Sequence, residues 1–247
     1  MTSYPAPLNI QLTVCSHQLA DYTFLVLGVI AGVANPIFTL QQNAILEIKK
    51  LIVEGELKFG QRINEVELSQ LLNMSRGPIR ESMQILYQQG LLTYKPRKGM
   101  YVTNLTKEDI KELFDIQLLL EKSSVELGFA NINETFISRV RSIVNEFQNK
   151  SIRFQKNTLV KLDTDFHREI VSLPNYNMLI NTWSGYNALL ALAFAKIFEY
   201  ETETAEDLVK EHKFLIEVIE KRDKDLLIQS LTNHYEQGKL KLLDVWK

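Results

Sequence analysis

The chain has few of the residues that cross-link a protein or place it in a membrane. It has one cysteine, Cys15, so no internal disulfide is possible, which favours a reducing cytoplasm. No Lys or Arg precedes Lys49, so the positively charged start of a secretory signal is missing. The apolar run at 22–34 is shorter than the about 20 residues of a membrane-spanning helix. We therefore expect a cytoplasmic protein that has no membrane partner.

The first 35 residues differ from the rest of the chain. Asp21 is their only charged residue, and the apolar run ends at Asn35-Pro36. A membrane anchor is the least favoured interpretation because of the length of the run. Two others stay open: a start assigned too far upstream, or an extension that packs on the surface. We treat residues 1–35 as an atypical N-terminal extension.

The remaining length is enough for two small domains, and charge divides unevenly between them. The formal net charge of the whole chain is −2. Residues 36–102 carry a net charge of +3, whereas residues 103–247 carry −4. A local basic excess suits a nucleic-acid partner, because attraction to phosphates is the main sequence-independent part of such binding.

Residues 36–102 show the order of elements of a winged helix-turn-helix domain. Helical periodicity covers 39–54, a short strand and turn follow at 56–63, and a second helix starts at an N-cap, Asn64, with Glu67 three residues on. A third helix is expected over 76–89, and two short apolar runs around 95–99 predict a hairpin with a basic tip. The buried face of the second helix is expected to consist of Val66, Leu68, Leu71 and Leu72.

The third helix has two distinct faces. One is apolar and is expected to face the core: Ile79, Met83 and Leu86. The other is polar and is expected to face a DNA major groove: Arg76, Arg80, Gln84 and Tyr87. Ser75, the expected N-cap, lies where a hydroxyl and the first helix amides meet a phosphate. On the hairpin, phosphate or minor-groove contacts are expected from Lys95, Arg97 and Lys98.

Residues 55–102 resemble the N-terminal domain of the GntR family of bacterial regulators. The diagnostic stretch is Ser75 to Glu81, SRGPIRE, which is similar to the SRTPVRE of the family. The resemblance implies that Arg76 and Arg80 contact operator DNA. The chain departs from the family pattern at three positions, where Phe59 replaces proline, Gly77 replaces threonine and Ser82 replaces alanine. The missing side chain at Gly77 removes one expected DNA contact.

From Thr106 onward the periodicity is helical, so residues 103–247 are expected to form an all-helical domain. The expected breaks lie at 131–134, 150–157, 174–175, 201–206 and 221–223. Three of the four histidines of the chain are here. Asp163 and His167 are spaced to share one helix face. His212 and His234 can join them only if the helix breaks near 221–223. From spacing alone, a metal site and three unrelated histidines both stay open.

Residues 106–238 resemble the FadR-type C-terminal domain (FCD) of one GntR subfamily. The motif D-x-x-F-H occurs at Asp163–His167, and its E-H, R-D and H positions occur at 211–212, 222–223 and 234. The resemblance implies a bundle of six or seven helices, a homodimer on palindromic double-stranded operator DNA, and a metal held by Asp163, His167, His212 and His234. Such a ligand set favours Zn, Ni or Mn.

The same resemblance points to an effector site. Where the family often has an arginine four residues before a glutamate, this chain has Gln117 and Glu121. Gln117 is therefore the candidate effector-binding residue, although an amide lacks the charged fork that an organic acid favours. We expect a mostly α-helical, non-enzymatic transcription regulator whose operator binding responds to a small molecule at the metal. The alternative is a metal-dependent hydrolase that uses the same Asp/His set.

Overall fold

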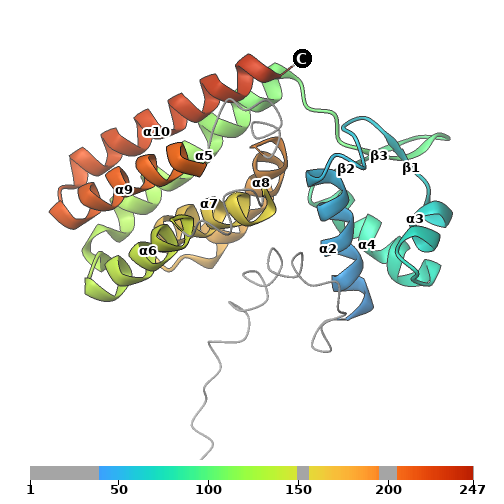
Figure 1. The fold of residues 1–247 in the computed structure, drawn as a ribbon, viewed down its shortest axis with the longest axis horizontal. Coiled ribbons are helices and arrows are strands. Elements are labelled where there is room, and N and C mark those ends of the chain that lie inside the picture. Colours follow the sequence, from blue (N-terminus) through green and yellow to red (C-terminus); the bar gives the residue numbers. More distant parts are fainter. Residues whose placement is uncertain (1–38, 149–155, 195–204, 247) are drawn as a thin grey trace, which may run out of the picture.

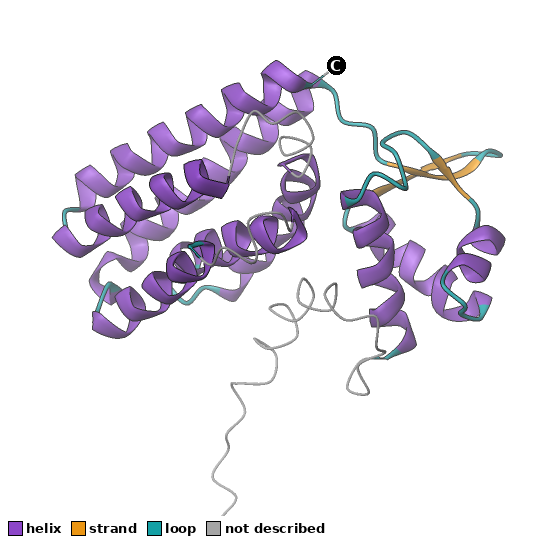
Figure 2. Ribbon diagram, viewed as in Figure 1, coloured by secondary structure: helices purple, strands orange, loops and turns teal. Residues whose placement is uncertain are grey.

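The computed structural model describes residues 39–148, 156–194 and 205–246, and the expected extension at 1–35 lies outside them. Figure 1 shows two parts: a small domain of helices and a three-stranded sheet on one side, and a bundle of longer helices on the other. Figure 2 shows that strands occur only in the small domain among the described residues. Of the described helices, none combines the length and apolarity that a membrane span requires.

The small domain has the expected winged helix-turn-helix order. It contains α2 (Leu40–Val53), β1 (Arg62–Ile63), α3 (Glu65–Leu71), α4 (Arg76–Gln88), β2 (Leu92–Lys95) and β3 (Gly99–Val102). The strands form an antiparallel sheet in the order β1-β3-β2. Thr39 and Gln42 form a capping box at the start of α2. Gly55 and Gly90, just after α2 and α4, adopt positive φ, as expected where a helix ends.

The core of this domain agrees with the prediction for α4 but not for α3. Ile79, Met83 and Leu86 are all buried. On α3, however, only Leu68 is buried, and the predicted burial of Val66 and Leu71 is wrong because both are exposed. The reason is that α3 is only seven residues long and packs mainly on α4, so one narrow stripe is covered.

Two further details of the small domain differ from expectation. Asn64 is the N-cap of α3 as predicted, but Glu67 binds the side-chain amide of Asn64 rather than its backbone N–H. Ser82, where the family has alanine, is fully buried and donates its hydroxyl to the carbonyls of Gln41 and Pro78. A buried serine is tolerated at this position because carbonyl oxygens of α2 and of its own helix are placed to accept a hydrogen bond from its hydroxyl.

The second domain is an all-helical bundle, as predicted. Its described helices are α5 (Lys107–Gly128), followed by the short 3-10 turn η1 (Phe129–Asn131), α6 (Glu134–Phe147), α7 (Lys156–Val171), α8 (Asn177–Phe194), α9 (Ala205–Lys221) and α10 (Lys224–Val245). The long helices α5 and α10 lie side by side, and α9 packs against α10 and α6 (Figure 1). Asp223 caps α10 by accepting from Leu226 N, so the chain reverses direction there.

The two domains are in direct contact. Helix α2 packs against α7 and α8, and Leu192 of α8 is buried within the core of the small domain. Phe59 packs edge-on against Trp246, with ring centroids 5.3 Å apart. Trp246 Nε1 donates to Leu105 O at 2.8 Å. Trp246, which follows α10, therefore contacts the small domain through Phe59 and the segment between β3 and α5 through Leu105.

Candidate metal centre and DNA-reading surface

Four side chains from three helices meet inside the bundle. Asp163 and His167 lie one turn apart on α7, His212 lies on α9 and His234 on α10. One ligand atom from each lies within 4.8 Å of the others. His167 Nε2 is 3.1 Å from His234 Nε2, and His212 Nε2 is 3.4 Å from Asp163 Oδ1. The reversal at Asp223 is what brings His234 back to His212.

Two of the three imidazoles are within hydrogen-bond distance of an oxygen through Nδ1, and the third lies near a carboxylate without such a bond. His167 Nδ1 lies 3.0 Å from Glu121 Oε2, and His212 Nδ1 lies 2.8 Å from Leu208 O. His234 Nδ1 lies 3.4 Å from Glu211 Oε2. The contacts of His167 and His212 would keep a hydrogen on Nδ1 and leave Nε2 to bind a metal ion. Three Nε2 atoms and a carboxylate oxygen face one point, the arrangement found around a bound metal ion.

The donor set fits a divalent transition metal. Bonds of about 2.1 Å to nitrogen or oxygen place neighbouring ligand atoms roughly 3.0–3.4 Å apart in tetrahedral or octahedral geometry. The two shortest separations here, 3.1 and 3.4 Å, lie in that range. His212 Nε2 is buried without a hydrogen-bond partner in the described part of the chain. Such an atom is costly unless something binds it, and a metal ion is the partner that the neighbouring donors specify.

The electrostatics of the site also suit a cation. Burial opposes ionisation of Asp163, but the neighbouring imidazoles, His212 first among them, outweigh it and lower the pKa of Asp163. Burial likewise opposes ionisation of Glu211, yet His234 and Lys241 bring its pKa to about 2. Burial would lower the pKa of His167, but the carboxylates of Glu121 and Asp163 raise it to about 9. The carboxylates of Asp163 and Glu211 are thus ionised at neutral pH, and His167 stays protonated until a metal ion displaces its Nε2 proton.

Glu121 and Tyr235 have roles that the sequence patterns did not reveal. Glu121 is fully buried, and its other oxygen, Oε1, accepts from the Tyr235 hydroxyl at 2.5 Å. This carboxylate orients His167 and is itself fixed by Tyr235. The available signals were weak: Glu121 lies one helical turn after Gln117, and Tyr235 is next to His234.

Gln117 lies one helical turn before Glu121, and only one end of its amide is engaged, since Oε1 is buried without a hydrogen-bond partner within the described residues. It is fully buried, and Nε2 donates to Trp183 O at 3.1 Å. It is not among the described residues that line the small pocket beside the histidines, which has a volume of about 40 Å³. That pocket is bounded by Asp163, His167, Glu211 and His234, and on its other side by Phe114, Asn187, Leu190, Ala191, Phe194, Tyr235 and Gly238. It has room for a few water molecules.

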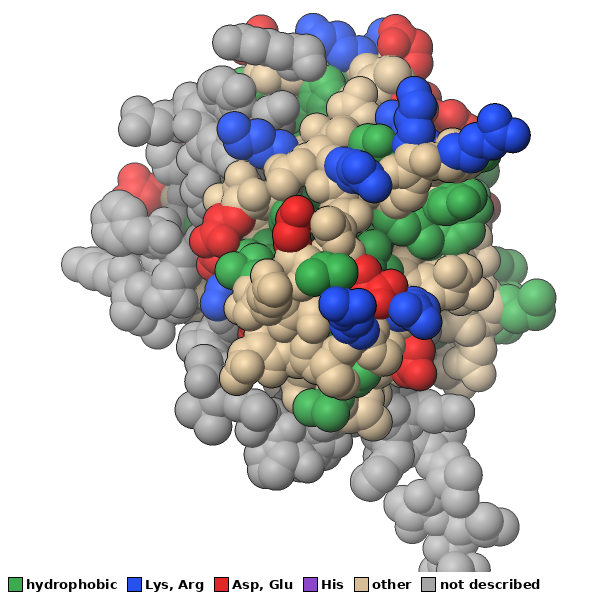
Figure 3. Space-filling view, turned by 90° about the vertical axis from the view of Figure 1, so that its right-hand side faces the viewer, with side chains coloured by type: hydrophobic (Ala, Val, Ile, Leu, Met, Phe, Trp, Pro, Cys, Tyr) green, Lys and Arg blue, Asp and Glu red, His purple; other side chains and the backbone are tan. Residues whose placement is uncertain are grey.

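The candidate DNA-reading residues lie in the other domain. Arg76, Arg80, Gln84 and Tyr87 are all exposed on α4. Figure 3 looks onto the small domain and shows Lys and Arg side chains spread over its surface, with acidic side chains between them. On the wing, Lys95, Arg97 and Lys98 are exposed, and Lys95 lies 4.4 Å from the centroid of the Tyr101 ring. The structure therefore presents every predicted DNA contact to solvent.

Arg80 and Ser75 each have local contacts that bear on DNA binding. Arg80 forms a two-pronged ion pair with Glu65 at the start of α3, at 2.8 and 3.0 Å. The pairing of Arg80 with Glu65 could not be seen in the sequence because the two lie on different helices. Ser75 is the N-cap of α4, yet its side chain makes no capping hydrogen bond. Its hydroxyl is thus available to a phosphate at the helix N-terminus.

Comparison with protein families divides the chain as the structure does. The model for bacterial regulatory proteins of the gntR family matches residues 40–102. The FCD domain model matches residues 112–237, which hold all four candidate metal ligands. Both matches lie within described domains, and the boundary between them falls between β3 and α5.

Individual relatives are similar over most of their length. The HTH-type transcriptional regulator YdhC of Bacillus subtilis is 30% identical over 191 residues, which cover 76% of this chain and 84% of that protein. The gluconate operon transcriptional repressor of Bacillus licheniformis is 27% identical over 206 residues, 81% of this chain and 84% of the repressor. The solved structure of McbR/YncC from E. coli has a TM-score of 0.72 at 18% identity, covering 85% of this chain and 100% of that one. At that identity the last likeness concerns the fold.

Proposed function

The chain is a DNA-binding transcription regulator that belongs to the GntR family and carries an FCD domain, and on this premise we propose that a small molecule at a metal-containing site controls its binding to DNA. The observation that carries the proposal is the convergence of three imidazole nitrogens and one carboxylate on a single buried point. Asp163, His167, His212 and His234 would hold the ion. The metal would supply a positive charge and open coordination positions for an oxygen of the effector.

On the DNA side, we propose that α4 reads bases while Ser75 and the wing bind phosphates. In a homodimer, the DNA-binding domain of each chain would contact one half of a palindromic operator. The repressor name of the Bacillus licheniformis relative supports a repressor role here. Fluorescence anisotropy with the DNA upstream of the gene, compared with scrambled DNA, tests operator binding. Sedimentation of the same sample tests the dimer.

A regulatory role is better supported than catalysis by the partners of the two additional carboxylates. Hydrolysis at a metal needs a base that can take a proton from water. Glu121 is engaged by His167 and Tyr235, and Glu211 is engaged by His234 and Lys241. Both carboxylates therefore orient the site. Turnover of ester or amide substrates by metal-loaded protein would contradict this proposal.

The metal content of the purified protein tests the proposed metal site. Protein purified without a histidine tag should contain about one Zn, Ni or Mn ion per chain by elemental analysis, since the ligands form one site. The His212→Ala variant should lose that ion but still bind DNA. Equal metal content in wild type and variant would contradict the assignment of ligands.

A further inference from the structure

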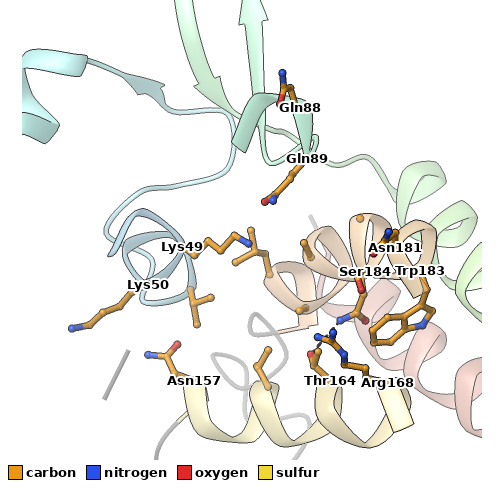
Figure 4. A pocket seen from close by; sticks show the side chains of 17 residues that line it. Lys49, Lys50, Gln88, Gln89, Asn157, Thr164, Arg168, Asn181, Trp183 and Ser184 are labelled. Carbon is orange, nitrogen blue, oxygen red and sulfur yellow. Dashed lines mark hydrogen bonds between the residues drawn. The ribbon is translucent and has the colours of Figure 1, made fainter. Parts of the chain in front are cut away.

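A second and larger cavity lies between the two domains. Its volume is about 280 Å³, against about 40 Å³ for the pocket at the histidines. One wall is formed by α2 and the C-terminal end of α4, and the other by α7 and α8 (Figure 4). Because the walls come from different domains, any ligand in this space contacts both the DNA-binding part and the helical bundle.

Lys49 brings a positive charge to the cavity, and none of the described residues that line it is acidic. Lys49 points from α2 into the space (Figure 4). Its ammonium group has no hydrogen bond or ion pair within the described residues, and burial lowers the pKa of Lys49 to about 8. Arg168, which also interacts with Asp165, adds a guanidinium from α7. A half-buried ammonium group without a counter-ion is costly, so its surroundings favour an anion.

The rest of the cavity is mostly apolar. Val53, Val160, Ala188, Ala191 and Leu192 form its apolar surface. The side-chain amide of Gln89 points into the space (Figure 4), and its Oε1 is buried without a hydrogen-bond partner in the described part of the chain. A ligand that satisfies both features has an apolar body, an acid group for Lys49 and a polar group for Gln89.

We propose that this interdomain cavity is a second ligand site, which binds an organic anion with an apolar body through Lys49. The site is separate from the metal pocket and needs no metal. The two share a wall, however, because Asn187 and Ala191 line both. Asn187 also donates to Thr164, the neighbour of Asp163. An anion held here stabilises one placement of the DNA-binding domain against the bundle, and it regulates DNA binding to the extent that it favours that placement.

A fluorescent pair of probes tests the proposal on the full chain. 1-Anilinonaphthalene-8-sulfonate has an apolar aromatic body and one negative charge, and N-phenyl-1-naphthylamine has the same body without the charge. Lys49→Met keeps the length of the side chain and removes its charge. We expect Lys49→Met to weaken binding of the sulfonate at least tenfold and to leave the neutral probe unchanged within twofold. Lys50→Met is the matched control, since Lys50 lies at the rim and points away from the middle of the cavity (Figure 4).

Other results would overturn the proposal. Equal affinity of the sulfonate for wild type and Lys49→Met would show that the probe binds elsewhere. The same conclusion would follow if Lys50→Met weakened sulfonate binding as much as Lys49→Met does. Ala188→Met, which fills the cavity from α8 without a change in charge, should weaken both probes at least tenfold. Unchanged binding in a folded Ala188→Met variant also excludes the cavity. Binding of the sulfonate should persist in His212→Ala, which separates this proposal from that of the metal site.

Discussion

Arg80 is the side chain on which base recognition is expected to depend, and in the structure it is held by Glu65. Both groups are at the surface, and their ion pair raises the pKa of Arg80 and lowers that of Glu65 through the hydrogen bonds between them. An exposed ion pair contributes little to folding. The ion pair instead fixes the position of the guanidinium group, near the N-terminal end of α4, with two of its nitrogens engaged.

Replacing Arg80 by alanine should reduce discrimination between operator and scrambled DNA by about tenfold or more, because a guanidinium that binds two base atoms contributes about 1–3 kcal/mol of discrimination. Lys98→Ala is the matched control. It should weaken binding to both DNAs alike and reduce the salt dependence of the affinity. Anisotropy titrations at several salt concentrations measure both effects. Unchanged discrimination by Arg80→Ala would show that α4 does not read the bases.

Replacing Glu65 by glutamine should strengthen binding to scrambled DNA, since one negative charge next to the phosphates is removed. The preference for operator should fall, because Arg80 loses the carboxylate that positions it. Thermal stability should hardly change, since the pair is exposed. Titrations of operator and scrambled DNA with the same protein give the ratio of the two affinities. A higher preference for operator in Glu65→Gln would contradict a positioning role for Glu65.

At the scale of elements, the junction between α5 and the turn after α7 is unusually close. A Cβ at Gly128 would lie 2.4 Å from the backbone of Leu173 and Pro174. Asn131 strengthens the same contact, as its side chain donates to Leu173 O at 2.7 Å. This contact sets the position of α7, and α7 carries Asp163 and His167.

Gly128→Ala should therefore destabilise the bundle by about 1–3 kcal/mol, the usual cost of forcing extra volume into a packed site. Gly185→Ala is the matched control, because a Cβ there meets nothing within 4 Å in the middle of α8. It should raise stability by about 0.5–1 kcal/mol, since alanine favours helix over glycine. Urea unfolding curves distinguish the two variants. Equal stabilities would mean that the backbone at Gly128 moves without cost.

Elements were predictable from local signals, and the family resemblance predicted that Asp163 and three histidines converge, whereas other long-range contacts were not predictable. Caps, glycines and hydrophobic periodicity located the helices, because these features act within a few residues. The histidines could be grouped because the break before Asp223 allowed two helices to reverse. By contrast, the exposure of Val66 and Leu71, the pairing of Arg80 with Glu65 and the support of His167 by Glu121 depend on which helices become neighbours. Local spacing carries no information about that.

For the whole molecule, Lys49 at the domain junction should make stability depend on pH. The pKa of Lys49 is lowered by burial from 10.5 to about 8, so the folded protein binds fewer protons than the unfolded chain between these values. Stability should therefore rise with pH from about 8 to 10.5. Below pH 8 the full cost of the buried charge is present. Lys49→Met should be more stable than wild type at pH 7 and should lack this rise, as measured by urea unfolding across that range. An identical pH dependence in both would contradict the prediction.

Metal removal should loosen the whole bundle rather than a single loop, because the ligands belong to α7, α9 and α10. The unfolded chain has no such site, so bound metal adds to the free energy of unfolding. At a free metal concentration 100 times the Kd, the gain is about 2.7 kcal/mol. For a chain of this size that corresponds to a Tm shift of roughly 5–10 °C.

Chelation of tag-free protein should lower Tm by this amount, and added Zn, Ni or Mn should restore it. His212→Ala should melt near the chelated wild type and respond to neither treatment. A wild-type Tm that is indifferent to chelator and to all three metals would refute the metal site, while the exposed residues of α4 and the wing, which lie in the other domain, would keep their assignment.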